Sequence, residues 1–255
     1  MLVSFMSCVA QNKTVFQIGN SDDSGAEFAL ANGDYDKFLE KDFGWEDRFY
    51  VVGYSKEQED FPFVLPGAID YWGGTSGLAG IRPHEINILF GIETKPTNDD
   101  WQLNIDVLDC SPEIPPYLKV IINGKPQKFK LDKGRNGEAL KGVTTDVKEQ
   151  LITIPIESEL IKRGGNSIQL TILEGSWLVF DQIRLEGPKD VKLLTPEKAF
   201  IRDVTPADYE LTVKGVAIQP LLVDVQHLND VALLTVKLDG EEIFKETIEP
   251  VSYTH

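Results

Sequence analysis

Residues 118–129 have the sequence LKVIINGKPQKF, which predicts a β-hairpin. The turn falls at Asn123-Gly124, a pair that tolerates the positive φ angles of a type I′ turn. Apolar residues lead into this turn and a second short segment leaves it. The hairpin places two antiparallel strands near the middle of the chain, and the prediction of the fold starts from them.

Strand patterns recur on both sides of this hairpin. Apolar and polar residues alternate, as in half-buried strands, over residues 101–107, 151–156, 168–172 and 177–186. The one helical segment expected among them is a short turn within residues 157–162. Closely spaced strands joined by turns predict an all-β fold, a jelly-roll β-sandwich, rather than alternating strands and helices.

A second set of strands follows Gly187-Pro188, the best candidate for a domain boundary. We expect the β-sandwich over residues 14–187 and a small β domain, Ig-like or a linker, over residues 188–255. Asp239-Gly240 predicts a further hairpin within residues 230–248. Because no closing element follows this hairpin, a truncated domain is an equal alternative.

Composition and charge exclude several classes of protein. The 255 residues are 42% hydrophobic and 26% charged, as in soluble globular chains. No apolar run reaches the ~18 residues of a membrane-spanning helix. The chain has 25 basic and 41 acidic residues, and its net charge of -16 repels phosphate backbones. We therefore expect neither a transmembrane span nor a nucleic-acid partner.

The N-terminus has features of an export signal. Residues 1–10 are mostly apolar and are followed by polar residues, which is typical of the last part of a signal peptide. We expect a secreted or periplasmic protein. Cys8 follows a poor lipobox, so a surface lipoprotein is less favoured. Without Cys8, Cys110 has no disulfide partner and is expected to be a buried apolar group.

Aromatic residues are concentrated in residues 45–72, which hold eight of the chain's 24 aromatic rings. Rings on loops at one end of a β-sandwich can stack on the apolar face of a sugar, while nearby polar groups bind its hydroxyls. The alternative is that the rings fill the core beneath a long loop. The candidate stacking residues are Trp45, Tyr71 and Trp72, and their candidate polar partners are Asp70, Arg82 and His84.

One carboxylate interrupts an otherwise apolar strand face. Asp181 alternates with apolar residues between Trp177 and Leu185, and a buried carboxylate is costly unless it is paired or binds a metal. The functional interpretation is a structural calcium site, because calcium takes oxygen ligands at variable spacing. The candidate ligands are Asp181, Asp22, Asp23 and Glu27. The alternatives are a bulge that turns Asp181 outward or a salt bridge with a base such as Arg184.

The sequence argues weakly against a catalytic site. Its three histidines, His84, His227 and His255, lie outside any HExxH motif. GxSxG, Walker and CxxC motifs are missing as well. A pair of carboxylates for glycoside hydrolysis stays open, because only geometry identifies such a pair. The sequence therefore leaves open whether the chain is an enzyme, and it favours a chain without a catalytic site.

An ordered set of segments resembles a known family. The segments are Phe16–Gly19, Phe28, Tyr50–Ser55, Asp60–Pro62, Ile86–Phe90, the strand from Trp101, Val120–Gly124, Leu160–Ile168 and Trp177–Glu186. Together they resemble the C-terminal carbohydrate-binding-like domain of rhamnogalacturonan lyases, polysaccharide lyase family 4, over about residues 15–187. The resemblance implies a galactose-binding-like jelly roll. In those lyases catalysis belongs to a separate N-terminal domain without a counterpart here, so no catalytic residue is implied.

These observations favour a non-catalytic carbohydrate-binding module of a secreted polysaccharide-degrading system. Its expected partner is a glycan, such as a plant cell-wall polysaccharide. One alternative is a structural β-sandwich that orients the adjoining catalytic domain of a larger glycoside hydrolase or lyase. Another is a polysaccharide lyase in its own right. Exposure of the aromatic rings discriminates binding from a structural role.

The net charge bears on the ligand. Rhamnogalacturonan is a polyanion, and a chain of net charge -16 repels it over distances of about the Debye length of ~8 Å. A neutral glycan, a basic patch near Arg48, Arg82 and His84, or a bridging calcium ion would resolve this conflict.

Overall fold

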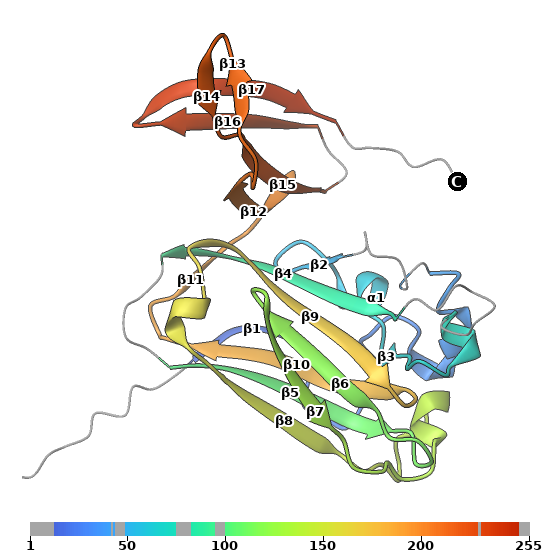
Figure 1. The fold of residues 1–255 in the computed structure, drawn as a ribbon. Coiled ribbons are helices and arrows are strands. Elements are labelled where there is room, and N and C mark those ends of the chain that lie inside the picture. The colour runs from blue at the N-terminus through green and yellow to red at the C-terminus, as the bar shows by residue number, and fades with distance from the viewer. Residues whose placement is uncertain are drawn as a thin grey trace, which may run out of the picture.

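Two β-sheets face each other in the larger part of the molecule (Figure 1). The structure is a computed structural model that describes residues 13–41, 43, 49–74, 83–94, 100–228 and 231–249. The predicted signal remnant, residues 1–10, lies outside the described residues. The strands form an all-β sandwich, which confirms the predicted fold class.

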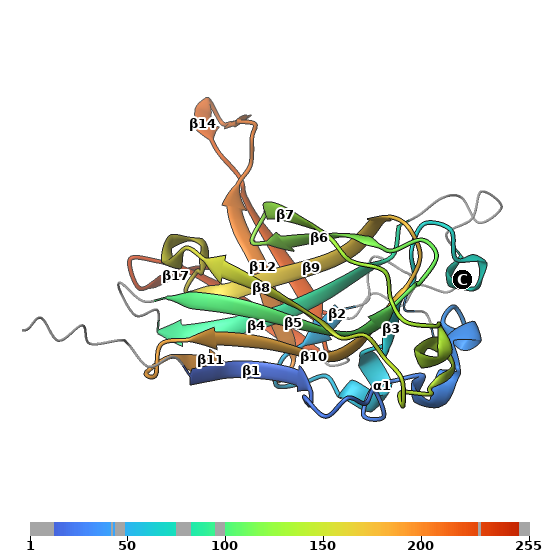
Figure 2. The same cartoon turned by 90° about the horizontal axis from the view of Figure 1, so that it is seen from below.

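The first sheet has five strands in the order β1-β10-β5-β8, with β3 paired to β10. Every pair in it is antiparallel. In the view from below, β1, β10, β5 and β8 are seen side by side (Figure 2). The bounds are β1 (Lys13–Gly19), β3 (Val64–Leu65), β5 (Trp101–Cys110), β8 (Gln150–Ile156) and β10 (Leu178–Gly187).

The second sheet has six strands in the order β11-β4-β9-β6-β7, with β2 parallel to β4. The bounds are β2 (Phe49–Val51), β4 (Glu85–Thr94), β6 (Tyr117–Ile122), β7 (Lys125–Lys130), β9 (Gly164–Glu174) and β11 (Lys192–Leu194). The hairpin β6–β7 turns at Asn123 and Gly124, whose φ angles are 46° and 85°. The predicted type I′ turn is confirmed because both residues have positive φ.

The core lies between the two sheets. Alternate residues of each strand point inward, so that the rings of Phe90, Trp101 and Phe180 are fully buried among aliphatic side chains. Cys110 is also fully buried and unpaired, which confirms its predicted role as an apolar group. Burial of this many apolar groups is the main source of stability of the sandwich.

Helical structure is confined to short turns between strands. The predicted turn within residues 157–162 is present as η5 (Ser158–Leu160). The others are η1 (Ala31–Gly33), η2 (Tyr35–Lys37), η3 (Tyr71–Gly73), η4 (Glu138–Lys141) and α1 (Glu57–Asp60). No helix of the described residues is long and apolar enough to cross a membrane.

The C-terminal strands form three two-stranded ribbons in the described chain, which we call the C-terminal arm (Figure 1). The Asp239-Gly240 hairpin is confirmed, with φ angles of 51° and 89°. Many apolar side chains of the arm stay exposed, for example Leu221 and Leu233. The ribbons are β12 (Ala199–Pro206) with β15 (Leu221–His227), β13 (Leu211–Val213) with β14 (Val216–Ile218), and β16 (Ala232–Leu238) with β17 (Glu241–Ile248).

The boundary between the sandwich and the arm lies later than predicted. Strand β11 pairs with β4 and thus belongs to the second sheet. The sandwich therefore continues to Leu194, not to Gly187. Strand β10 ends at Gly187, and a short connection to the second sheet begins there. A Gly-Pro pair marks such a connection within a domain as well as a linker between domains, so the sequence did not distinguish the two.

Candidate functional site

Within the described part of the aromatic-rich segment, three rings lie in the interior, those of Phe49 and Trp72 are half-buried, and those of Tyr54 and Tyr71 are exposed. Tyr50, Phe61 and Phe63 are at most 8% exposed. The ring of Phe61 lies 5.5 Å from those of Tyr50 and Phe180. Tyr50 lies in β2, and Phe61 and Phe63 lie in the connection between α1 and β3. All three rings belong to the hydrophobic core, where burial of their apolar area is favourable. The expectation that this segment displays its rings to solvent is wrong for these three residues.

Trp72 and His84 also pack toward the core. Trp72 is half-buried, with its ring 5.0 Å edge-on from Tyr35 and 6.0 Å from Phe38. His84 is 4% exposed and lies 5.1 Å edge-on from Phe38. The prediction that His84 binds sugar hydroxyls is therefore wrong, and Trp72 presents at most part of its ring to solvent.

Asp70 anchors a loop instead of facing solvent. Its Oδ2 accepts a hydrogen bond from the Gly67 amide at 2.7 Å, and its Oδ1 accepts one from the Ser176 hydroxyl at 2.6 Å. Burial raises the pKa of the Asp70 carboxyl, and the hydrogen bonds from Ser176, Gly67 and the Trp177 amide limit the rise. Asp70 is 7% exposed, so its predicted role as a sugar partner is wrong.

Tyr71 is the residue of this group that the loop presents to solvent. It begins η3, directly after the anchored Asp70, and its side chain is 79% exposed. Its role as a stacking platform stays a prediction. Trp45 and Arg82, the remaining candidates, lie outside the described residues.

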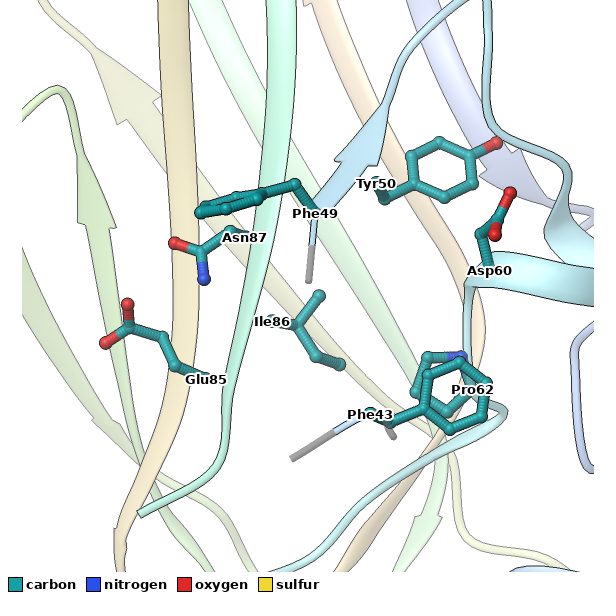
Figure 3. A pocket seen from close by; sticks show the side chains of 8 residues that line it. All are labelled: Phe43, Phe49, Tyr50, Asp60, Pro62, Glu85, Ile86 and Asn87. Atoms are coloured by element: carbon teal, nitrogen blue, oxygen red, sulfur yellow. The ribbon is translucent and has the colours of Figure 1, made fainter. Parts of the chain in front are cut away.

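A shallow cleft adjoins the outer face of β4 (Figure 3). Phe49 of β2 lies above Asn87 of β4, and Glu85, also of β4, lies near both (Figure 3). The cleft holds about 20 Å³, which is room for about one water molecule and too little for a sugar ring. The sequence interpretation missed these residues, although Glu85 and Asn87 alternate with apolar residues along β4 as outward-facing residues do.

Asp181 is buried beside the loop that follows β1. Its side chain is 1% exposed, and its Oδ1 accepts a hydrogen bond from the Ser24 amide at 3.1 Å. The pairing of β10 with β5 is irregular on either side of Asp181, as at a bulge, but the side chain stays buried instead of turning outward to solvent. Burial raises the pKa of the Asp181 carboxyl to about 6, and the carboxylates of Asp106 and Asp22 add to the rise.

Of the other candidate calcium ligands, only Asp22 lies near enough for its carboxylate to affect the pKa of Asp181. Asp22 and Asp23 are exposed, and Glu27 accepts a hydrogen bond from the Asn20 amide at 2.6 Å. Within the part of the chain that the structure describes, no three acidic, histidine or cysteine side chains lie close enough to hold a metal ion. The described residues do not provide a calcium ligand set, and calcium stays a prediction.

The replacement Asp181→Asn tests both the buried charge and calcium. The folded pKa of about 6 lies above the ordinary 3.8, so the folded protein binds this proton more tightly than the unfolded chain. The resulting stabilisation is full below the ordinary pKa and is lost as pH rises through about 6. In EDTA, Asp181→Asn should therefore raise the free energy of unfolding at pH 7 by roughly 1–2 kcal/mol, with little effect near pH 4.

Denaturant unfolding at both pH values measures this difference, with the exposed Asp190→Asn as control. A loss of stability at pH 7 in EDTA would contradict the conclusion that burial of the Asp181 charge is destabilising. A calcium-dependent rise in the wild-type melting temperature that Asp181→Asn abolishes would support the calcium prediction. An unchanged melting temperature with calcium would remove it.

A family model matches the sandwich. The model described as "CBM-like: Polysaccharide lyase family 4, domain III" aligns with residues 14–185, about two thirds of the chain. The chain belongs to this family. The match confirms the resemblance inferred from the ordered segments, and the sandwich is a CBM-like domain. A comparison with curated proteins found no match.

Several solved structures are similar to parts of this CBM-like chain. A family 35 carbohydrate-binding module from an environmental isolate is 14% identical, with a TM-score of 0.31, and the match covers 45% of this chain and 73% of that module. The corresponding module of Cellvibrio japonicus Abf62 is 16% identical, with a TM-score of 0.29, covering 44% and 70%.

A larger protein is also similar over part of its length. A family GH115 4-O-methyl-α-glucuronidase with specificity for decorated arabinogalactans is 16% identical, with a TM-score of 0.33. The match covers 72% of this CBM-like chain but 19% of that enzyme.

Proposed function

We propose that this chain is a non-catalytic module that binds a neutral glycan in a secreted polysaccharide-degrading system. Membership of the CBM-like family supports this proposal, because the family is defined by a carbohydrate-binding-like domain of a polysaccharide lyase. An adjoining catalytic domain would act on the polysaccharide that the module holds. A plant cell-wall glycan is the expected ligand.

The observation that carries the proposal is the exposure of Tyr71. Its ring is 79% exposed, while the preceding Asp70 is fixed by two hydrogen bonds. A rigid base and an exposed ring suit a stacking platform, because little conformational entropy is lost when a sugar binds. The exposed loop residues Ala68 and Ile69 lie beside the ring in sequence and extend the apolar surface.

Charge selects among glycans. The net charge of -16 disfavours a polyanionic ligand. A galactan or galactomannan should therefore bind better than polygalacturonate.

Affinity electrophoresis of the full chain tests the proposal with these three polysaccharides. The neutral glycans should retard wild type, and Tyr71→Ala should weaken the interaction at least about tenfold because the stacking surface is lost. Tyr209→Ala, which removes another exposed tyrosine, is the matched control. Unchanged retardation of Tyr71→Ala, or preferential binding of polygalacturonate, would refute the proposal.

A second candidate function is structural. The burial of Tyr50, Phe61 and Phe63 favours it, because rings that fill the core are unavailable to a ligand. In this case the sandwich would orient an adjoining catalytic domain without binding sugar. Retardation by none of the three polysaccharides would favour this function over glycan binding.

A further inference from the structure

A polar pocket lies where the C-terminal arm crosses the outer face of the second sheet. Its volume is about 270 Å³. The sheet contributes Asn87, Ser167 and Gln169, and the arm contributes Arg202, Asp203 and Asp224. We call this site the arm pocket. It needs both parts of the chain, because each part provides only one of its walls.

Apolar packing holds the arm over the sheet. Phe200 and Leu228 of the arm are buried against Val51 and Leu89 of the sandwich. The hydroxyl of Tyr54 donates a hydrogen bond to the Leu228 carbonyl oxygen at 2.8 Å. Such packing stabilises the relative placement of the two walls, so the arm pocket is formed before any ligand enters.

Arg202 is fixed from two sides. Its guanidinium lies 4.3 Å from the centroid of the Phe49 ring, a distance typical of cation–π contacts. Its Nη1 lies 3.4 Å from Oδ2 of Asp224. The ring thus holds Arg202 in place, and Arg202 in turn orients a carboxylate at the arm pocket.

The charges of the arm pocket cancel. Arg202 pairs with Asp224, and Lys162 Nζ lies 3.6 Å from Oδ1 of Asp203. Asp203 and Asp224 are opposite each other in the β12–β15 ladder, where two unpaired carboxylates would repel. With two cations and two carboxylates, the site has no net charge to attract an ion.

Amide side chains complete the site. Gln169 Nε2 donates a hydrogen bond to Asn87 Oδ1 at 3.1 Å, which orients both amides along the sheet. Carboxylates accept hydrogen bonds from hydroxyls, and amides both donate and accept them. This combination around a small concave volume matches adjacent hydroxyls of an uncharged ligand.

We propose that the arm pocket is a second carbohydrate site that binds a single uncharged sugar residue. Its volume lies below the ~300 Å³ at which pockets for drug-sized ligands begin, so it suits one ring rather than a chain. The proposal extends the proposed glycan binding to a second place. It uses none of the residues around Tyr71, so each proposal can fail without the other.

Chemical-shift mapping of the ¹⁵N-labelled full chain tests the proposal with D-galactose, L-rhamnose and D-galacturonate. The two neutral sugars should shift the backbone amide signals of Ser167, Gln169 and Asp224, with a Kd on the order of 1 mM. Galacturonate should cause smaller shifts, because a pocket without net charge does not compensate the desolvation of its carboxylate. These signals should respond equally in Tyr71→Ala.

Variants separate binding from folding. Asp224→Asn and Gln169→Leu should each weaken galactose binding about tenfold. The first replaces a charged acceptor by a weaker neutral one, and the second removes a hydrogen-bond partner of a hydroxyl. Asp239→Asn, at the exposed β16–β17 turn, is the matched control. In Gly165→Ala the new methyl group would meet the Ile201 carbonyl oxygen and lift β12, so the response should be lost.

Three results would overturn the proposal. These are the lack of any shift at the arm pocket with either neutral sugar, galacturonate binding as tight as galactose binding, and wild-type affinity in both Asp224→Asn and Gln169→Leu. Loss of the arm-pocket response with retention of the Tyr71-dependent response in Gly165→Ala would support it.

Discussion

Replacing Phe61 with alanine should lower the free energy of unfolding by about 3–5 kcal/mol, because the replacement leaves a cavity in the core. Phe61 is fully buried, and its ring lies 5.5 Å from each of the rings of Phe28, Tyr50 and Phe180. These neighbours come from distant parts of the chain and cannot all move into the gap. Urea denaturation monitored by tryptophan fluorescence measures the loss.

Tyr71→Ala is the matched control for Phe61→Ala. Both residues belong to the aromatic-rich segment, but Tyr71 is 79% exposed. Its replacement should change the stability by at most about 0.5 kcal/mol. A loss below about 1 kcal/mol in Phe61→Ala, or a similar loss in both variants, would contradict the division of this segment into core rings and displayed rings such as Tyr71.

Gly134→Ala should be destabilising by roughly 3 kcal/mol, through steric overlap rather than a cavity. A Cβ atom at this position would lie 2.5 Å from Asp109 Oδ1 and would overlap the Cys110 carbonyl oxygen. Asp109 Oδ1 cannot move freely, because it accepts hydrogen bonds from the Cys110 and Arg135 amides at 2.9 Å each. The backbone around the end of β5 would have to shift.

Gly25→Ala is the control for the glycine replacement. A Cβ atom at Gly25 would have its nearest contact at 3.5 Å, an ordinary van der Waals distance. This variant should be neutral or stabilised by a few tenths of a kcal/mol, because alanine restricts the unfolded chain. Melting temperatures of the two variants by circular dichroism give the comparison. Equal melting temperatures would contradict the prediction, because they would show that the backbone around Gly134 shifts without a loss of stability.

Local patterns in the sequence were sufficient for the strands and turns. Alternation predicted β5, β8, β9 and β10, and the positive-φ pairs Asn123-Gly124 and Asp239-Gly240 predicted the two hairpins. These signals act between residues a few positions apart, where steric preferences and the two-residue repeat of a strand are decisive. The linker signal at Gly187-Pro188 was equally local, and it could not reveal that β11 returns to pair with β4.

The site depended on contacts that no local pattern encodes. From the sequence, Tyr71 and Trp72 were candidate stacking residues, and Asp70 and His84 were their candidate polar partners. Long-range packing buries Asp70 and His84 and exposes Tyr71. Asp70 is held by Ser176, 106 residues away. Burial is a property of the assembled sheets, so the same residue type serves as an anchor at one position and as a display residue at the next.

The all-β sandwich and its family were thus determined by the sequence, because strand alternation and turn preferences are short-range effects repeated many times along the chain. Tertiary structure alone decided which rings face solvent, why Asp181 lies beside Ser24, 157 residues away, and where the arm closes a pocket over the sheet. The physical reason is that desolvation and side-chain packing depend on which distant segments meet, and this is settled only when the two sheets and the arm have come together.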